Sequence, residues 1–398
     1  MRRPHELQDM DASSYERICL CALNTIFGYN PMAGLALIEG LGSGAAAFAL
    51  EPAELRGLLR GYPVHASRMD GRALEAAASQ LEDMAARGAA FVSVADDCYP
   101  ELLRECPDRP IGLYVCGASP PEILFSKKPV IAIVGTRDIS PYGRKWCRRI
   151  VEALSCTEEK PLITSGLAYG TDIAAHMHAL DLGLPTIAVM ATGIDSVYPA
   201  SHRGAARRIV RGEGCAVITD YPPGTEPIPI NFIRRNRIIA GMSSAVILIE
   251  SRIKGGGMTT ARLADGYSRP VYALPGRTDD ERSQGCNRLI GEKTAEIFTD
   301  ADDLVLRLGL HASARAPERS AAERLRVRYH RTLSEPKIEA VSKVYAAIEA
   351  SAGISPDSIC RQTGLAWPEV AECSSILEND GLISVDLLQR CSTTGKPF

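Results

Sequence analysis

Short, strongly apolar segments recur through the middle of the chain and alternate with longer stretches whose apolar residues have helical spacing. The apolar segments are rich in Val and Ile and read as buried strands of a parallel sheet. The predicted strands are 130–134, 161–164, 186–191, 216–219, 245–250, 271–274 and 296–298. The intervening helices are expected at 142–155, 171–182, 201–211, 233–242 and 258–267. This alternation predicts an α/β fold over residues 91–310, with an extended, Rossmann-like, doubly wound and mostly parallel sheet.

The segment before the sheet, residues 1–90, has a purely helical pattern and predicts a small helical domain. Around Gly40–Gly44 a helix, a GLG turn and a second helix give the outline of a SAM-like or helix-hairpin-helix domain. Such a hairpin can offer backbone amides to a phosphate. Basic residues usually accompany a DNA-binding hairpin and are missing here, so an ordinary helical bundle is the favoured interpretation.

The pattern changes again after residue 310. Residues 311–331 carry six arginines against two glutamates without a core pattern, which predicts a basic linker, either flexible or a solvated helix. Helices are expected at 337–351, 355–363 and 367–379, with a strand at 382–385, so residues 332–398 resemble a winged-helix domain. The stretch WPEVAECSSILEND, residues 367–380, has three Glu, one Asp and no Lys or Arg. A protein-contact or structural role is therefore favoured over DNA reading.

Bulk composition is that of an ordinary globular protein and excludes several classes. The chain has 398 residues, 45% hydrophobic content and a formal net charge of −3, so it does not read as a general nucleic-acid coat. Its twelve cysteines include no CxxC pair, which favours reduced thiols over disulfides or zinc. Neither a signal peptide nor a membrane-spanning apolar run is apparent. We expect a cytoplasmic protein without a metal or other cofactor.

Positive charge is concentrated between residues 231 and 261. Five cations, Arg234, Arg235, Arg237, Arg252 and Lys254, face one acid, Glu250, so that this stretch carries 5 − 1 = +4. A glycine run and Phe232 lie within the same stretch. Cations, open backbone amides and an aromatic ring suit a single-stranded nucleic acid. The alternative is a solvated helix followed by a turn.

Three glycine-containing loops follow predicted strands and are expected to meet at one edge of the sheet, where ligands of such folds bind. They begin at Gly135, Ser165 and Lys254. Glycine lets a phosphate approach the backbone, and arginine donates two hydrogen bonds to it. The loops match neither the dinucleotide pattern GxGxxG nor the ATP-binding pattern GxxxxGK[ST], so no nucleotide cofactor is expected.

At these loops the chain resembles the DprA (Smf) family of bacterial DNA-processing proteins. The matching stretches lie in order between residues 129 and 290 and include IAIVGTRDISPYG, LITSGLAYGTDIAAHMHAL, DYPPGTEPIPINFIRRNRIIAGMS and GGGMTTARLADGYSRPVYALPGR. The resemblance implies a non-enzymatic protein that binds and protects single-stranded DNA without sequence preference. It also implies loading of RecA onto incoming DNA in natural transformation and recombination, and a homodimer joined through the Rossmann-like domain.

The same resemblance implies the site residues. Phe232 corresponds to an aromatic that stacks on bases, and Lys254, before three glycines, is expected to supply further charge. The implied phosphate-binding residues are Gly135, Thr136, Arg137, Ser165, Gly166, Arg235, Asn236, Arg237, Lys254, Gly256, Gly257 and Thr259.

An enzyme is the alternative. Rossmann-like proteins with a PGGxGTxxE loop hydrolyse the glycosidic bond of nucleoside monophosphates, and their loop resembles the stretch from Gly255. That chemistry needs a carboxylate on the following helix, but Arg262 stands two residues past Thr260 and the first acid is Asp265. The sequence leaves open the RecA contact, the dimer surface and the role of the winged-helix domain.

Overall fold

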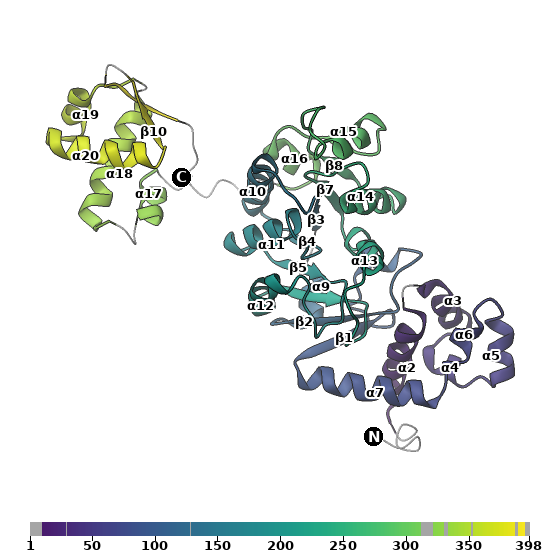
Figure 1. Cartoon of the computed structure of the whole chain (residues 1–398). Coiled ribbons are helices and arrows are strands. Elements are labelled where there is room, and N and C mark those ends of the chain that lie inside the picture. The colour runs from purple at the N-terminus through teal and green to yellow at the C-terminus, as the bar shows by residue number, and fades with distance from the viewer. Residues whose placement is uncertain are drawn as a thin grey trace. The chain divides into compact units, whose positions relative to one another are not determined.

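The computed structural model describes residues 10–28, 30–127, 129–311, 321–329, 333–351, 353–386 and 389–394. These residues belong to two compact units, Met1–Ala312 and Ser313–Phe398 (Figure 1). In the described residues no helix is both long enough and apolar enough to cross a membrane.

The first unit is built on a sheet with the strand order β1-β2-β6-β5-β4-β3-β7-β8-β9. The seven predicted strands are confirmed, and they pair in parallel from β6 to β9. Their bounds are β3 (Val130–Val134), β4 (Leu162–Ser165), β5 (Thr186–Val189), β6 (Ala216–Thr219), β7 (Ala245–Leu248), β8 (Val271–Ala273) and β9 (Glu296–Ile297). Two strands not predicted, β1 (Ala89–Ser93) and β2 (Gly112–Gly117), extend the sheet in antiparallel pairing.

Helices cover both faces of the sheet, as a doubly wound fold requires. Figure 1 shows α10, α11 and α12 on one side and α13 and α14 on the other, and α13 packs against α14. The bounds are α8 (Glu101–Arg104), α9 (Pro121–Ser126), α10 (Pro141–Ser155), α11 (Thr171–Asp181), α12 (Arg203–Arg211), α13 (Pro229–Gly241), α14 (Gly256–Gly266), α15 (Gln284–Gly291) and α16 (Ala301–Arg307). The central strands β4, β5, β6 and β7 are buried along their whole length, which is why their sequences lack a polar face.

The order of the strands places the site. From β3 the chain moves through β4 and β5 to β6, whereas from β7 it moves the opposite way to β8 and β9. Neighbouring strands whose connections leave in opposite directions form a topological switch point, and the crevice at their carboxyl ends is where such sheets bind ligands. The switch point here lies between β3 and β7, and β4 is the other neighbour of β3. The three predicted loops therefore follow three adjacent strands.

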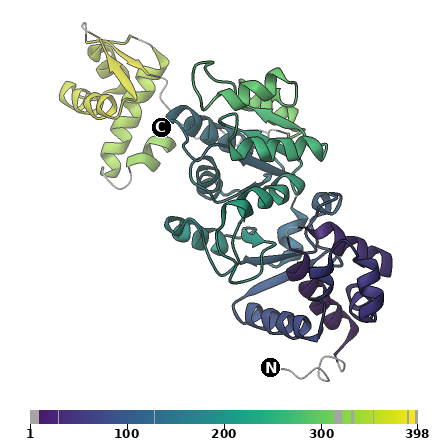
Figure 2. The ribbon, with the colours of Figure 1, turned by 45° about the vertical axis from the view of Figure 1, so that its right-hand side comes forward.

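The N-terminal helices pack beside β1 and β2 at one end of the sheet (Figure 2). They are α2 (Ala12–Phe27), α3 (Pro31–Leu41), α4 (Gly44–Phe48), α5 (Pro52–Leu58), α6 (Pro63–Ala66) and α7 (Gly71–Ala86). At the α3–α4 turn the Glu16 carboxylate accepts hydrogen bonds from the amides of Gly44, at 2.6 Å, and Ala45, at 2.7 Å. A helix-hairpin-helix would offer these amides to a phosphate. In this chain an internal carboxylate occupies them, which supports the favoured interpretation of a helical bundle.

The second unit contains the predicted helices and strand, and a further strand completes a hairpin, an arrangement compatible with a winged helix. Its elements are α17 (Ala321–Tyr329), α18 (Glu335–Ala350), α19 (Pro356–Thr363), α20 (Trp367–Asn379), β10 (Ile383–Val385) and β11 (Cys391–Thr393). The stretch interpreted as a basic linker behaves differently from expectation in its second half. There α17 packs on α18, and Leu325 and Tyr329 are buried in the core of this unit. Residues 312–320 and 330–331 of that stretch lie outside the described residues.

Candidate nucleic-acid interface

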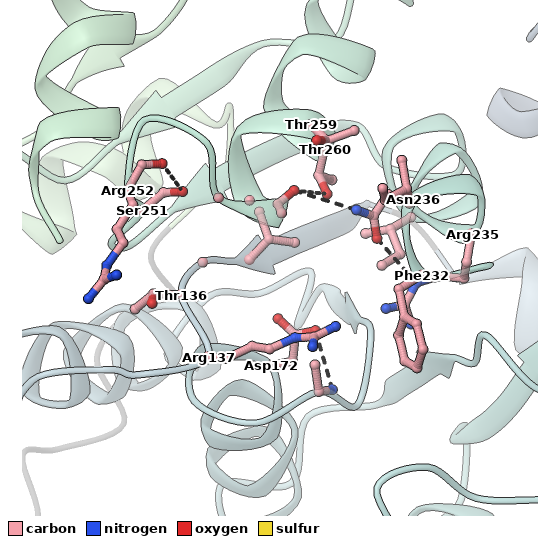
Figure 3. A pocket seen from close by; sticks show the side chains of 18 of the residues that line it. Thr136, Arg137, Asp172, Phe232, Arg235, Asn236, Ser251, Arg252, Thr259 and Thr260 are labelled. Carbon is pink, nitrogen blue, oxygen red and sulfur yellow. Dashed lines mark hydrogen bonds between the residues drawn. The ribbon is translucent and has the colours of Figure 1, made fainter. Parts of the chain in front are cut away.

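A pocket of about 510 Å³ opens at the switch point, above the carboxyl ends of β3 and β7. Its walls come from the loop after β3, from the loop after β7 with the first turn of α14, and from the first turns of α13 (Figure 3). Ten of the thirteen predicted site residues line it: Gly135, Thr136, Arg137, Phe232, Arg235, Asn236, Lys254, Gly256, Gly257 and Thr259. The structure therefore brings together most, but not all, of the predicted set.

The floor of the pocket consists of two glycines in contact. A Cβ at Gly135 would lie 2.5 Å from the Thr171 hydroxyl oxygen and 2.9 Å from the Glu250 carbonyl oxygen. A Cβ at Gly257 would lie 3.1 Å from the Cα of Gly135. Side chains at either position would push the two loops apart, so both glycines serve the close approach of the loops.

Arg137 and Phe232 form the polar and aromatic mouth of the pocket. The exposed Arg137 guanidinium carbon lies 5.1 Å from the centre of the Phe232 ring, and Figure 3 shows the side chain extending toward that ring. Tyr198, which is 45% exposed, meets Phe232 edge to face at 5.3 Å. The helix that carries Phe232 begins at Pro229, earlier than the predicted Ile233, so the ring projects from its first turn. An arginine held over an aromatic ring keeps both its charge and its planar donors available.

The opposite wall is the loop that leads into α14. Lys254 is exposed, Gly255 caps the helix, and Gly256 and Gly257 form its first turn, two residues before the predicted start at Met258. A Cβ at Gly256 would meet nothing within 4 Å, so this backbone faces open space. The first amides of a helix lack helical partners and attract anions.

Two cations at this pocket are free of acids. Among the described residues, neither Arg137 nor Lys254 has an ion pair within 4 Å or a hydrogen bond. A third cation, Arg252, lies across the pocket from Phe232 and approaches Glu281 at 3.6 Å with both side chains exposed (Figure 3). Such an exposed pair contributes little free energy, so Arg252 adds to the positive potential of the pocket.

Two arginines expected to line the pocket, Arg235 and Arg237, are buried and hold other parts of the chain in place. Arg235 is 3% exposed and donates hydrogen bonds to the carbonyl oxygens of Gly166, at 2.7 Å, and Val189. Arg237 is 6% exposed and forms an ion pair with the buried Asp220 at 2.5 Å. The prediction that Arg237 lines the pocket differs from the structure, and Arg235 reaches the pocket only as part of its inner wall.

In the loop after β4, the polar groups of Ser165 and Gly166 likewise already have hydrogen-bond partners within the protein. The Ser165 hydroxyl donates to the Ile133 carbonyl oxygen at 2.7 Å, and the Gly166 amide donates to the Asp172 carboxylate at 3.1 Å. The first amide of α11, that of Thr171, donates to the Thr136 carbonyl oxygen at 3.1 Å. The structure thus places Ser165 and Gly166 behind the pocket, where they hold the first loop in position, and not at its surface.

Asp172 is the one carboxylate among the described lining residues. Burial raises its pKa, against the opposing effect of the nearby Arg235 cation and of hydrogen bonds from Ser165, Ala168 and Gly166. Burial also lowers the pKa of Arg235 to about 10. These groups form a desolvated layer below the pocket, which positions the loops and leaves Arg137, Arg252 and Lys254 as its exposed charges.

Tyr198 is a lining residue that the sequence analysis did not assign. It follows β5 in the stretch SVYPA, one strand further along the sheet than the three glycine loops. The sequence feature that could have identified Tyr198 is its position, as an aromatic residue in a loop that follows the carboxyl end of a strand. Its partner Phe232 lies 34 residues later, so their contact depends on the fold.

Comparison with known proteins agrees with this fold. The family model described as DNA recombination-mediator protein A matches residues 90–309, which is more than half of the chain. The chain belongs to this family. Putative DNA processing protein DprA of Mycobacterium tuberculosis is 33% identical over 323 residues, 78% of this chain and 79% of that protein. DNA processing protein DprA of Streptococcus pneumoniae is 38% identical over 213 residues, 54% of this chain and 72% of the relative.

A solved structure of the family shows the same architecture. The X-ray structure of DNA processing protein A from Streptococcus pneumoniae aligns with a TM-score of 0.58 and 31% identity, covering 72% of this chain and 95% of the other. The resemblance predicted from the loop motifs is confirmed. The family is one of DNA-processing proteins, which makes the cationic pocket at the switch point the natural candidate for a DNA contact.

Proposed function

We propose that this protein binds single-stranded DNA without sequence preference through the pocket between β3 and β7. The observation that carries the proposal is the exposed, unpaired Arg137 guanidinium held over Phe232 at 5.1 Å, with Tyr198 at the edge of the same ring. A cation beside two partly exposed aromatic side chains matches a phosphate beside an unstacked base.

The lining residues divide into three roles under this proposal. Arg137 and Lys254 contact phosphates as exposed cations, and the first turn of α14 offers its amides at Gly256 and Gly257. Phe232 stacks on a base, with Tyr198 supporting it. The inner residues Ser165, Gly166, Arg235, Asn236 and Arg237 act indirectly, because their hydrogen bonds and ion pairs fix the loops that carry the contacts.

Strand preference and salt dependence test this function. We expect a labelled single strand to bind more tightly than a duplex of the same sequence, because a duplex hides the base faces that Phe232 needs. The logarithm of the affinity should fall linearly with that of the salt concentration, with a slope of about 0.7 per phosphate contact. Fluorescence anisotropy with both DNAs at several salt concentrations measures both quantities. Equal affinity for the two DNAs would refute the stacking role.

Hydrolysis of a nucleoside monophosphate is the second candidate, because Asp172 lies in the pocket with a raised pKa. Its Oδ2 accepts hydrogen bonds from the amides of Gly166, at 3.1 Å, and Ala168, at 3.4 Å. A carboxylate held in this way caps a loop, and Asp265 on α14 is exposed and is not one of the lining residues in the described chain. We therefore favour binding without catalysis. Release of free adenine from AMP by purified protein, abolished by Asp172→Asn, would establish the enzyme instead.

The family resemblance supports a wider role. We infer that the protein acts in the cytoplasm as a homodimer joined through its Rossmann-like sheet, protects incoming DNA and loads RecA onto it during natural transformation and recombination. Analytical ultracentrifugation tests the dimer. RecA-dependent ATP hydrolysis on DNA coated with single-strand-binding protein tests loading, since a loader shortens the lag before hydrolysis begins. A monomer at micromolar concentration with no effect on the lag would remove this part of the proposal.

A further inference from the structure

A row of arginines on α12 lies beyond the pocket and is not explained by the contacts described so far. Arg203, Arg207 and Arg211 are spaced four residues apart, so that they lie on one face of the helix, and all three are exposed. The same helix buries Ala206 and Ile209 against the sheet. We call these three arginines the α12 stripe.

The α12 stripe has no acidic partner among the described residues, in contrast to the neighbouring Arg208. Arg208, on the same helix, pairs with Asp181 at 2.6 Å. In the described part of the chain none of the three stripe residues has an ion pair within 4 Å. From Arg203 to Arg211 the helix rises roughly 12 Å. Three uncompensated charges at regular spacing cost free energy through mutual repulsion and favour a polyanion as their partner.

A groove of about 430 Å³ runs along this stripe. Its walls combine the three arginines with Ser196 and Val197 of the loop after β5. One acid, Asp195, also lines it, and its carboxylate accepts hydrogen bonds from the Gly224 amide at 3.0 and 3.1 Å. The charged part of the lining therefore consists of three cations and one carboxylate that already has a partner, and the remaining lining residues are mostly apolar.

Exposed aromatic side chains connect the groove to the pocket. The loop that contributes Val197 to the groove contributes Tyr198 to the pocket. On the other side Ala168 lines the pocket, and the neighbouring Tyr169 is 48% exposed, with its hydroxyl 3.0 Å from the Ser201 hydroxyl oxygen. Arg203 begins α12 two residues after Ser201, so the short segment 197–203 contributes residues both to the pocket and to the stripe.

We propose that a single strand leaving the pocket passes over Tyr198 and Tyr169 and lays its phosphates along the α12 stripe. This rests on the function proposed above, and adds a second contact region that lengthens the binding site. The stripe presents only guanidinium groups to the backbone, so its contribution is independent of base sequence. Extra length then strengthens binding through additional phosphate contacts.

The test compares oligothymidylates of two lengths, one of roughly 6 nucleotides that fills the pocket and one of roughly 20 that also reaches the stripe. The variant replaces Arg203, Arg207 and Arg211 together by Gln, and Arg208→Gln is the matched control on the same helix. We expect the variant to bind the long strand on the order of tenfold more weakly at low salt and its salt slope to fall by about 2. Binding of the short strand should stay at the wild-type level.

Three outcomes overturn the proposal while leaving the pocket hypothesis intact. The first is an unchanged long-strand slope in the triple variant. The second is an equal loss for both lengths, and the third is an equal loss in the Arg208→Gln control. Failure of the wild-type protein to bind either strand would instead refute the proposed function itself. Thermal unfolding of each variant shows whether α12 remains folded.

Discussion

Arg137 carries the same charge as Arg235 and Arg237, but it is exposed to solvent whereas they are buried. Arg137, in the loop after β3, is exposed and has an aromatic ring as its only partner among the described residues. Arg235 and Arg237, on α13, are buried and their donors are directed to carbonyl oxygens and to Asp220. A buried cation could bind a phosphate only by giving up its present partners, and this would leave those partners buried and unpaired. The comparison indicates that the pocket binds with exposed cations and uses buried ones as its frame.

Among the tests of this contrast between exposed and buried arginines, the largest loss of stability is expected when Arg237 is mutated. Arg237→Ala leaves Asp220 buried without its partner, which should lower the free energy of unfolding by about 3–5 kcal/mol. Urea unfolding followed by Trp146 emission in a Trp367→Phe background reports on the correct unit, because the chain has two tryptophans. Arg208→Ala, which breaks an exposed pair, is the control and should cost less than about 1 kcal/mol. A stable Arg237→Ala protein that no longer binds DNA would return Arg237 to the interface.

The buried residues around Arg235 also predict how the free energy of unfolding depends on pH. Burial, followed by the nearby Arg235 cation, lowers the pKa of His176 to about 3, whereas an unfolded histidine titrates near 6.5. Between these values the unfolded chain binds a proton that the folded chain does not. His176 should therefore cost the protein about 1.4 kcal/mol of stability for each unit of pH below 6.5. His176→Gln should flatten the pH dependence of the unfolding free energy, and an identical slope in both proteins would show that His176 titrates normally.

Mutation of Phe232 tests whether its ring stacks on a DNA base or only packs against the protein. Phe232→Ala should weaken single-strand binding by about 1–3 kcal/mol if the ring stacks on a base. Phe232→Tyr keeps the ring and should retain most of the affinity. Anisotropy titrations measure the loss, and calorimetry checks the fold. If the alanine variant loses thermal stability while its affinity for DNA is unchanged, the ring has a structural role and does not contact DNA.

The last comparison uses a pair of glycines, of which Gly256 has the smallest expected effect. A Cβ at Gly166 would lie 2.4 Å from a guanidinium nitrogen of Arg235, so Gly166→Ala should destabilise the protein by about 1–3 kcal/mol through overpacking. A Cβ at Gly256 meets open space, so Gly256→Ala should change stability by less than about 1 kcal/mol. Its methyl group would face the pocket, and a modest loss of DNA affinity would be its main effect. Similar unfolding curves for the two variants would contradict the division into frame and contact surface.

The sequence predicted the sheet well because its strands are buried on both faces. Val130–Val134 and Ala245–Leu248 are short Val- and Ile-rich runs with no polar face, and such runs have few other interpretations. Strands β1 and β2 were not predicted. They pair in antiparallel fashion at one end of the sheet. Strand β2 lies between β1 and β6, and its Gly117 pairs with Ala216, 99 residues further along the chain, so spacing in the sequence does not reveal this contact.

The site was predicted less completely, for a different reason. Spacing identified the loops at Gly135 and Lys254, since strand ends are visible in the sequence. Whether an arginine is free depends on its partners, and the partner of Arg237 is a carboxylate 17 residues earlier, at the end of another strand. The family motif includes both arginines without separating contact from support. Only the folded chain shows that Arg137 is exposed and Arg237 is buried.

The salt dependence of single-strand binding by Arg137→Ala tests the central claim most directly. If Arg137 contacts a phosphate, the alanine variant should bind every sequence more weakly, and its slope of log affinity against log salt should be smaller than the wild-type slope by about 0.7. An unchanged slope, with the variant fully folded, would contradict the account by removing the exposed cation from the DNA contact.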